Sequence, residues 1–190
     1  MVFTEEFGPA AFITRARKEG LRDFGACMSP TSAFHILQGI ETLGMRMQRH
    51  VQNTRSIVEF LHSQDIVAKV SYPEMDGHPD QSLASELLPR GCGAVFSFDL
   101  KGGRGAGIAF VDALDLFSHL ANVGDAKSLV IHPASTTHHR MDAAALAAGG
   151  ISEGTIRLSI GLEDCDDLIG DLKQGLRAAG KAMERQEGQR

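Results

Sequence analysis

Hydrophobic residues recur at intervals of three, four or seven over residues 30–62, which is the spacing of one face of an amphipathic helix. The series consists of Ala33, Leu37, Ile40, Met47, Val51, Val58 and Leu61. Ser29 and Pro30 precede it and suit the N-cap and the first helical position, where proline loses no hydrogen bond. The pattern predicts one long helix from residue 30 to about residue 62. Such a helix would measure on the order of 50 Å, a length typical of a connection between two bodies.

The rest of the chain alternates between the two periods of regular structure. Alternating apolar and polar residues predict short strands at 67–72, 94–100, 128–132 and 155–160. Helical spacing predicts helices at 12–21, at 82–88, from a turn at 101–107 through about residue 120, at 141–148 and from about 163 to 183. Helices interleaved with strands indicate an α/β or α+β domain. We therefore expect two parts, residues 1–62 with the long helix and residues 63–190 as the α/β domain.

Composition narrows the class of protein. The 190 residues leave room for one good-sized core, and 43% hydrophobic with 23% charged residues is ordinary for a globular chain. A net charge of -5 gives no electrostatic reason to expect nucleic acid or an anionic membrane as a partner. No apolar run approaches the roughly 20 residues of a membrane span, and the first residues do not resemble a signal peptide. The widely spaced Cys27, Cys92 and Cys165 predict reduced thiols in a cytoplasmic protein.

Candidate chemistry gathers around the strand predicted at 128–132. Residues 134–139, which follow it, supply three hydroxyls and two imidazoles. In the strand predicted at 155–160, Ile156 and Leu158 share one face, which leaves Arg157 on the other. A guanidinium presents a fixed donor fork that fits a carboxylate. The pattern is compatible with a carboxylate-binding site, but by itself it favours an ordinary interface arginine beside capping hydroxyls.

The glycine-rich segment 101–107 invites comparison with a nucleotide-binding loop. It contains no G-x-x-x-x-G-K-[ST], and G-x-G-x-x-G would need a glycine where Ile108 stands. We therefore interpret the segment as a turn that leads into a helix through Val111, Leu114, Phe117 and Leu120.

Four segments, 6–17, 25–50, 122–138 and 154–164, resemble the C-terminal part of the pyridoxal-phosphate-dependent Cys/Met metabolism enzymes. The resemblance runs from about Glu6 to Ala178. Within this family, the Q-G-I-E-T-L of residues 38–43 is similar to the O-acetylhomoserine sulfhydrylase branch, because the cystathionine synthases and lyases typically have R-G-[LI]-K-T-L there.

The resemblance implies a fold like that of aspartate aminotransferase. Residues 1–62 would be the tail of the large pyridoxal-phosphate domain followed by a long interdomain helix, and residues 63–190 the smaller C-terminal domain with a largely antiparallel sheet. It also implies substrate-binding roles. Arg157 matches the arginine that grips the α-carboxylate, Ser128 a serine beside the reactive lysine, and Thr137 a position close to the same site.

The resemblance gives no metal site to His132, His138 and His139, which could otherwise suggest a metal cluster. The resemblance instead favours the interpretation that they are loop histidines, which support the site indirectly.

The chain departs from the family at the cofactor. Family members hold pyridoxal phosphate on a lysine in an S-x-T-K type motif, and this motif is absent from the sequence, whose lysines are Lys18, Lys69, Lys101, Lys127, Lys173 and Lys181. Because the protein's part in such an enzyme is to hold and tune the cofactor, we expect no covalently bound pyridoxal phosphate and no catalysis by the chain alone.

The complete enzyme would make homocysteine from O-acetylhomoserine and sulfide by γ-replacement, in methionine biosynthesis. The implied partners are the amino-acid substrate, a large pyridoxal-phosphate domain and further copies in a homo-oligomer, usually a tetramer in the family. An apolar face of the predicted long helix would be exposed without that domain, so we also expect self-association. Two alternatives stay open: a non-catalytic association module or half of a split enzyme, and a family member that performs cystathionine synthesis or γ-elimination.

Overall fold

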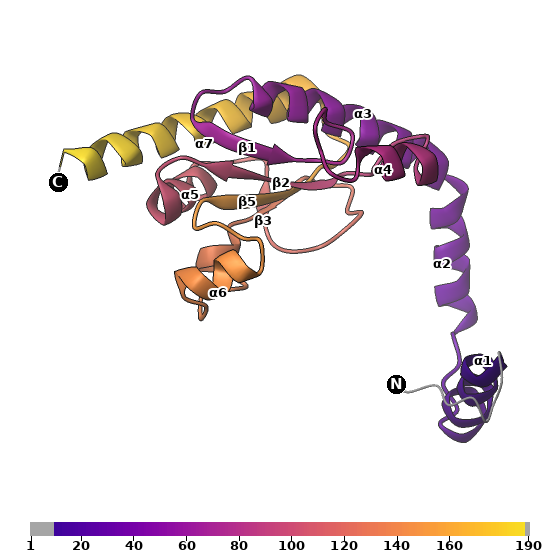
Figure 1. Cartoon of the computed structure of the whole chain (residues 1–190). Helices are drawn as coiled ribbons and strands as arrows, with labels where there is room; N and C mark the ends of the chain where they lie inside the picture. Colours follow the sequence, from indigo (N-terminus) through magenta and orange to yellow (C-terminus); the bar gives the residue numbers. More distant parts are fainter. Residues whose placement is uncertain (1–9, 189–190) are drawn as a thin grey trace. The chain divides into compact units, whose positions relative to one another are not determined.

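The computed structural model describes residues 10–188 (Figure 1), so the first nine residues of the predicted 1–62 part lie outside the described residues. Its contacts divide the chain into two compact units with the boundary between Gly44 and Met45.

The first unit is helical. It contains α1 (Ala11–Arg15), which continues as the π-helix η2 (Ala16–Asp23), and α2 (Pro30–Glu41). The predicted cap is present, because the Ser29 Oγ accepts a hydrogen bond of 3.1 Å from the backbone N–H of Ser32. No residue of α2 is buried, and its Phe34, Leu37 and Ile40 are each more than half exposed. The apolar helix face expected from the sequence is therefore found on α2.

The predicted single helix over residues 30–62 is wrong in its continuity. Helix α2 ends at Glu41, Thr42 leaves the helical conformation at φ −100° and ψ 0°, and α3 runs over Leu43–His62. Gly39, Thr42 and Gly44 are all weak helix formers, which favours a break in the helix at this point.

The second unit is built on a five-stranded sheet with the order β1-β2-β5-β4-β3. The strands are β1 (Val67–Ser71), β2 (Val95–Leu100), β3 (Ser118–His119), β4 (Leu129–Ile131) and β5 (Thr155–Ser159). The pairs β1/β2, β2/β5 and β4/β5 are antiparallel, and only the short β3 runs parallel to its neighbour β4. The α/β class predicted from the sequence, with its largely antiparallel sheet, is confirmed.

The helices of this unit are α3, α4 (Gln81–Leu87), α5 (Gly103–Asp112), α6 (Ala143–Ala148), α7 (Cys165–Glu187) and the short 3-10 helix η3 (Pro133–Ser135). In Figure 1, α7 runs along one side of the sheet and α6 lies on the other. No helix in the described part of the chain is both long enough and apolar enough to cross a membrane.

The core lies between the sheet and α3, α5 and α7. Ile156, Leu158 and Ile160 project into it and are fully buried. Phe98 in β2 meets Phe110 of α5 edge to face, with ring centroids 5.6 Å apart. This packing fixes β5, the strand that carries Arg157, in the middle of the sheet.

Helix α3 fixes the far end of β5 by polar contacts. His50, which is buried, donates from Nδ1 to the carbonyl oxygen of Ile160 at 2.6 Å, since a carbonyl can only accept. Asn53 donates from Nδ2 to the carbonyl oxygens of Gly161 at 3.1 Å and of Glu163 at 3.0 Å. Buried backbone carbonyls at this strand end are thus satisfied by side chains.

The prediction of a helix that extends to about residue 120 is also wrong. Helix α5 begins at Gly103, inside the glycine-rich segment interpreted as a turn, and ends at Asp112. The buried Asp171 carboxylate of α7 accepts hydrogen bonds from the backbone N–H groups of Asp115, Leu116 and Phe117, which fixes a non-helical loop there.

Candidate functional site

Arg157 lies in a row of residues that crosses the sheet. It pairs with Ser97 of β2 on one side and with Ile131 of β4 on the other, and Ser97 pairs in turn with Ser71 of β1. Directly opposite residues of antiparallel strands project to the same face. Two serine hydroxyls and one guanidinium therefore share the sheet face that is opposite to Ile156 and Leu158.

An open cavity of about 480 Å³ lies over this row. Its floor includes Ser71, Ser97 and Arg157. The loops that flank α6 also line it, with Thr137 and His138 before the helix and residues 150–151 after it. No Asp, Glu or Lys of the described residues is among those that line it. Arg157 is therefore the single fully charged side chain of the described cavity.

The Arg157 side chain is half-buried and has no hydrogen bond or ion pair with any described residue. A guanidinium carries five donors, and removing it partly from water without a partner costs free energy. A ligand carboxylate would restore this loss with two parallel charge-assisted bonds. The arrangement suits recognition of an anion of carboxylate shape.

Thr137 also lines the cavity, as the sequence prediction requires of a residue close to the site. Its hydroxyl lies 2.8 Å from Nδ1 of His138, a contact in which either group can donate according to the tautomer of the imidazole. Thr137 is exposed and His138 is half-buried, so both can meet a ligand. The structure thus brings Thr137 and Arg157 together.

Ser128 is placed differently. It is fully buried, and its Oγ donates to the Glu163 carboxylate at 2.9 Å and accepts from the Gly161 backbone N–H at 2.8 Å. Its own N–H donates to the second oxygen of Glu163 at 2.7 Å. Ser128 does not line the cavity, and its hydroxyl would have to leave both bonds to meet a substrate. Its substrate-binding role stays a prediction.

The histidines of the loop have backbone or hydroxyl partners. His132 is buried, with Nε2 2.8 Å from the carbonyl oxygen of Glu153 and Nδ1 2.8 Å from the Ser135 hydroxyl. Because the carbonyl can only accept, we assign the proton to Nε2. Burial lowers the pKa of His132 below its usual value. His139 donates to the carbonyl oxygen of Thr136. Within residues 10–188, no group of three or more His, Cys, Asp or Glu side chains could hold a metal ion.

Sequence reasoning missed Ser71 and Ser97. The signal was present for Ser97, because Phe96 and Phe98 flank it in a strand and must face the core together, which leaves Ser97 on the cavity face. The match of Ser71 with Arg157 across two strands depends on register and has no local signal.

A family profile described as "Cys/Met metabolism PLP-dependent enzyme" matches residues 8–177. The sulfhydrylase FUB7 of Fusarium oxysporum is 49% identical over 177 residues, which cover 93% of this chain and 41% of the relative. The O-acetyl-L-homoserine sulfhydrylase 1 of Thermus thermophilus is 46% identical over 173 residues, which cover 91% and 41%. The chain spans about two fifths of the length of these curated relatives.

Solved structures of the same group of enzymes are also similar to this chain. A structure from Campylobacter jejuni described as an O-acetylhomoserine (thiol)-lyase matches with a TM-score of 0.79 at 40% identity, over 89% of this chain and 40% of the other. Cystathionine gamma synthase from Xanthomonas oryzae, solved with cystathionine, matches with a TM-score of 0.76 at 42% identity, over 84% and 41%. These neighbours have the aspartate-aminotransferase-like fold, so the fold that the sequence implied is confirmed. The chain belongs to the family of pyridoxal-phosphate-dependent enzymes of Cys/Met metabolism.

Proposed function

We propose that this chain is the substrate-binding portion of an O-acetylhomoserine sulfhydrylase and that Arg157 binds the α-carboxylate of the amino acid. The complete enzyme would replace the acetate of O-acetylhomoserine by sulfide and yield homocysteine, with pyridoxal phosphate as cofactor. One observation carries the proposal: a half-buried guanidinium without a partner among the described residues faces a cavity that no carboxylate lines.

In this proposal Arg157 supplies orientation. Its planar fork holds both carboxylate oxygens, which fixes the amino acid at one end and limits its rotation. Thr137 lies at the same cavity and can add a neutral hydrogen bond. Ser128 could hydrogen-bond the substrate only if its hydroxyl gave up its bonds to Glu163 and Gly161. We therefore assign the carboxylate to Arg157 first and to Thr137 second.

The residues of the described cavity do not fit covalently held pyridoxal phosphate. Covalent attachment needs a lysine amine, and none of the lysines lines the cavity. We therefore derive no chemical step through the cofactor in this chain. The large domain of the complete enzyme would hold the cofactor, and we propose that the complete enzyme is a cytoplasmic homo-oligomer.

The sulfhydrylase reaction is favoured by the two sulfhydrylases among the relatives described above and by the Q-G-I-E-T-L of residues 38–43. A second candidate is cystathionine synthesis, because a cystathionine gamma synthase structure is equally similar to this chain. The carboxylate-binding role of Arg157 is the same for both, since both substrates are amino acids.

A binding experiment tests the role of Arg157. The full chain, labelled with ¹⁵N, is titrated in NMR with O-acetyl-L-homoserine and with its α-carboxamide analogue. We expect the carboxylate to shift the signals of cavity residues and the carboxamide to bind roughly 10- to 100-fold more weakly, the range of a charge-assisted hydrogen bond. Arg157→Gln should lose the same factor, whereas Arg177→Gln, at an exposed position of α7, should not. Equal affinity for both ligands would contradict the proposal.

An activity experiment tests whether the large domain is needed to hold the cofactor while this chain binds the substrate. The chain is mixed with pyridoxal phosphate, O-acetylhomoserine and sulfide, with and without the large-domain polypeptide of the Thermus relative. Homocysteine should form only in the mixture of both polypeptides. Turnover by the chain alone would show that it does hold the cofactor productively.

A further inference from the structure

Two loops supply walls of the cavity. Residues 132–139 contribute Thr137 and His138, and residues 149–154 contribute Gly150 and Ile151. Neither loop contains a strand of the sheet, and the only regular structure in them is the single turn η3. No backbone–backbone hydrogen bond joins these two loops, all of whose residues are described, so side-chain contacts contribute to their relative position.

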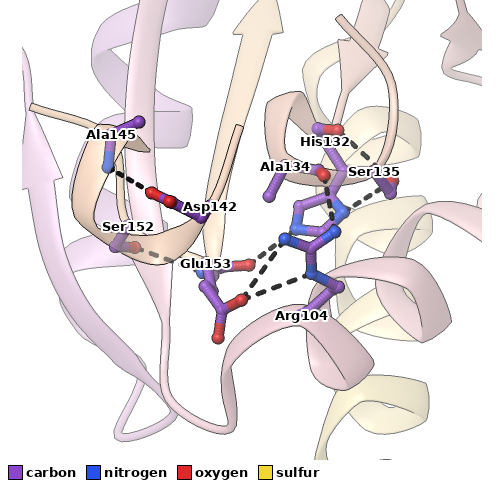
Figure 2. Close-up of polar contacts among 9 residues, drawn as sticks. Arg104, His132, Ala134, Ser135, Asp142, Ala145, Ser152 and Glu153 are labelled. Carbon is purple, nitrogen blue, oxygen red and sulfur yellow. Dashed lines mark hydrogen bonds and ion pairs between the residues drawn. The ribbon is translucent and has the colours of Figure 1, made fainter. Parts of the chain in front are cut away.

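His132 joins the two loops. From the start of the first loop, its buried imidazole bonds the carbonyl oxygen of Glu153 in the second loop at 2.8 Å. Its other nitrogen lies 2.8 Å from the hydroxyl of Ser135, one turn along the first loop (Figure 2). One ring thus fixes the backbone of the second loop and the turn of the first.

Arg104 joins both loops to helix α5. Its Nη1 donates to the carbonyl oxygen of Ala134 in the first loop at 2.9 Å. Its Nη2 and Nε lie 3.3 Å and 3.4 Å from Oε1 of Glu153 in the second loop. Figure 2 shows the guanidinium between the two loops, beside the imidazole of His132. We call Arg104, His132 and Glu153 the loop clamp.

Helix α5 can pack closely against His132 because Gly107 has no side chain. A Cβ at Gly107 would lie 2.5 Å from Nε2 of His132, so the ring occupies the space beside the glycine backbone. The first loop therefore rests on α5 at Gly107 as well as at Arg104. Helix α5 belongs to the core, because its Phe110 and Val111 are buried. The loop clamp therefore attaches both loops to the rigid part of the unit.

The ion pair alone would stabilise the unit little. The side chains of Arg104 and Glu153 are 37% and 48% exposed, and exposed pairs contribute about 0–1 kcal/mol. The clamp differs from an ordinary surface pair because it also bonds two backbone carbonyls, at Ala134 and Glu153. Such bonds restrict the path of the loops.

We propose that Arg104 and His132 are positioning residues that set the spacing of Thr137 and His138 against residues 150–151, and thereby the fit of the substrate bound at Arg157. The loop clamp touches no substrate itself. The inference rests on the proposed function of the cavity, but its structural half can be tested without any ligand.

The first measurement is hydrogen exchange on the full chain. Arg104→Gln removes the charge and the fork from a partly exposed side chain, so the unit should still fold, and thermal unfolding checks this. We expect exchange to rise roughly tenfold in both loops together, as for a segment whose opening becomes easier, with the sheet unchanged. Arg177→Gln is the matched control and should leave both loops unchanged. Unchanged exchange, or a rise in one loop alone, would overturn the clamp.

The second measurement is the affinity for O-acetyl-L-homoserine by NMR titration. Arg104→Gln should weaken binding about fivefold, less than Arg157→Gln, because it disturbs the walls and leaves the guanidinium of Arg157 in place. Arg104→Lys should recover part of both the affinity and the protection, since an ammonium keeps the charge without the fork. Unchanged affinity in Arg104→Gln would overturn the positioning role.

The two proposals fail in different ways. If the wild-type chain does not bind the amino acid, the proposed function fails, and the exchange data still decide whether the clamp couples the loops. If binding depends on Arg157 but not on Arg104, the proposed function stands and the positioning inference is wrong.

Discussion

On one face of β5, Ile156 and Leu158 are fully buried against the helices of the core. On the other face of the same strand, Arg157 lies half-buried in an open cavity and has no partner among the described residues. One residue step along the strand separates the two environments. The core face is filled with close-packed apolar side chains, whereas the cavity face carries hydroxyls and a cation.

This difference shows how the unit can leave a guanidinium unpaired. The apolar burial on the core face supplies the stability of the sheet, so the cavity face does not need to contribute. Substitutions on the two faces should therefore have separable effects. Those on the core face should change the free energy of unfolding, and those on the cavity face should change ligand affinity.

The largest effect is expected from Leu158→Ala. Leu158 is fully buried in the middle of β5, and removing a buried leucine side chain typically costs about 2–5 kcal/mol because a cavity remains. Urea unfolding followed by circular dichroism measures this loss. The affinity of the folded fraction for O-acetyl-L-homoserine should not change. A loss of affinity in a fully folded sample would mean that the two faces are coupled.

Local patterns in the sequence were sufficient to assign the two faces of β5. The period of two placed Ile156 and Leu158 opposite Arg157, because this property depends only on neighbours along the chain. The cavity could be predicted only in part. The bond from His132 to Glu153 and the pairing of Ser71 with Ser97 join residues that are distant in sequence, and no local signal encodes them.

The glycine-rich segment shows why one element was misplaced. The sequence predicts a turn over 101–107, because its glycine spacing matches no nucleotide-binding motif. In the structure residues 103–107 form the first part of α5. Gly107 is needed there for close contact with His132, which is a tertiary reason invisible in a single sequence. The break at Thr42 was missed because the apolar spacing continues across it.

A second test concerns a polar contact on the covered side of the sheet. The Asp171 carboxylate accepts three backbone N–H groups, from Asp115, Leu116 and Phe117, at 2.8 to 3.2 Å. Asp171→Ala should destabilise the unit by about 2–4 kcal/mol, because one buried and two part-buried N–H groups lose a charged acceptor. Urea unfolding measures the loss. Unchanged stability would mean that water replaces the carboxylate without cost.

Ser128→Ala tests the buried serine to which the family resemblance gives a substrate-binding role. If its hydroxyl acts only through Glu163 and Gly161, the substitution should cost about 1–3 kcal/mol of stability and leave ligand affinity unchanged. Ser97→Ala, at a hydroxyl that lines the cavity, is a matched control and should change stability less. A fall in affinity with unchanged stability would instead place Ser128 at the substrate.

The smallest effect on stability is expected from Arg157→Gln, the residue at the centre of the cavity face. Its side chain has no hydrogen bond or ion pair with any described residue, so the folded chain loses no contact of that kind. Arg157→Gln removes a charge that is held partly out of water, which favours the folded state. This gain offsets the packing lost with the methylene groups of the arginine side chain. We expect the free energy of unfolding to change by less than about 0.5 kcal/mol, as for substitutions away from the core. The same variant should lose carboxylate binding, so it would combine near-normal stability with the largest loss of binding among these variants. A clear loss of stability without ligand would show that Arg157 is a structural residue, and the division of β5 into a stabilising face and a binding face would then be wrong.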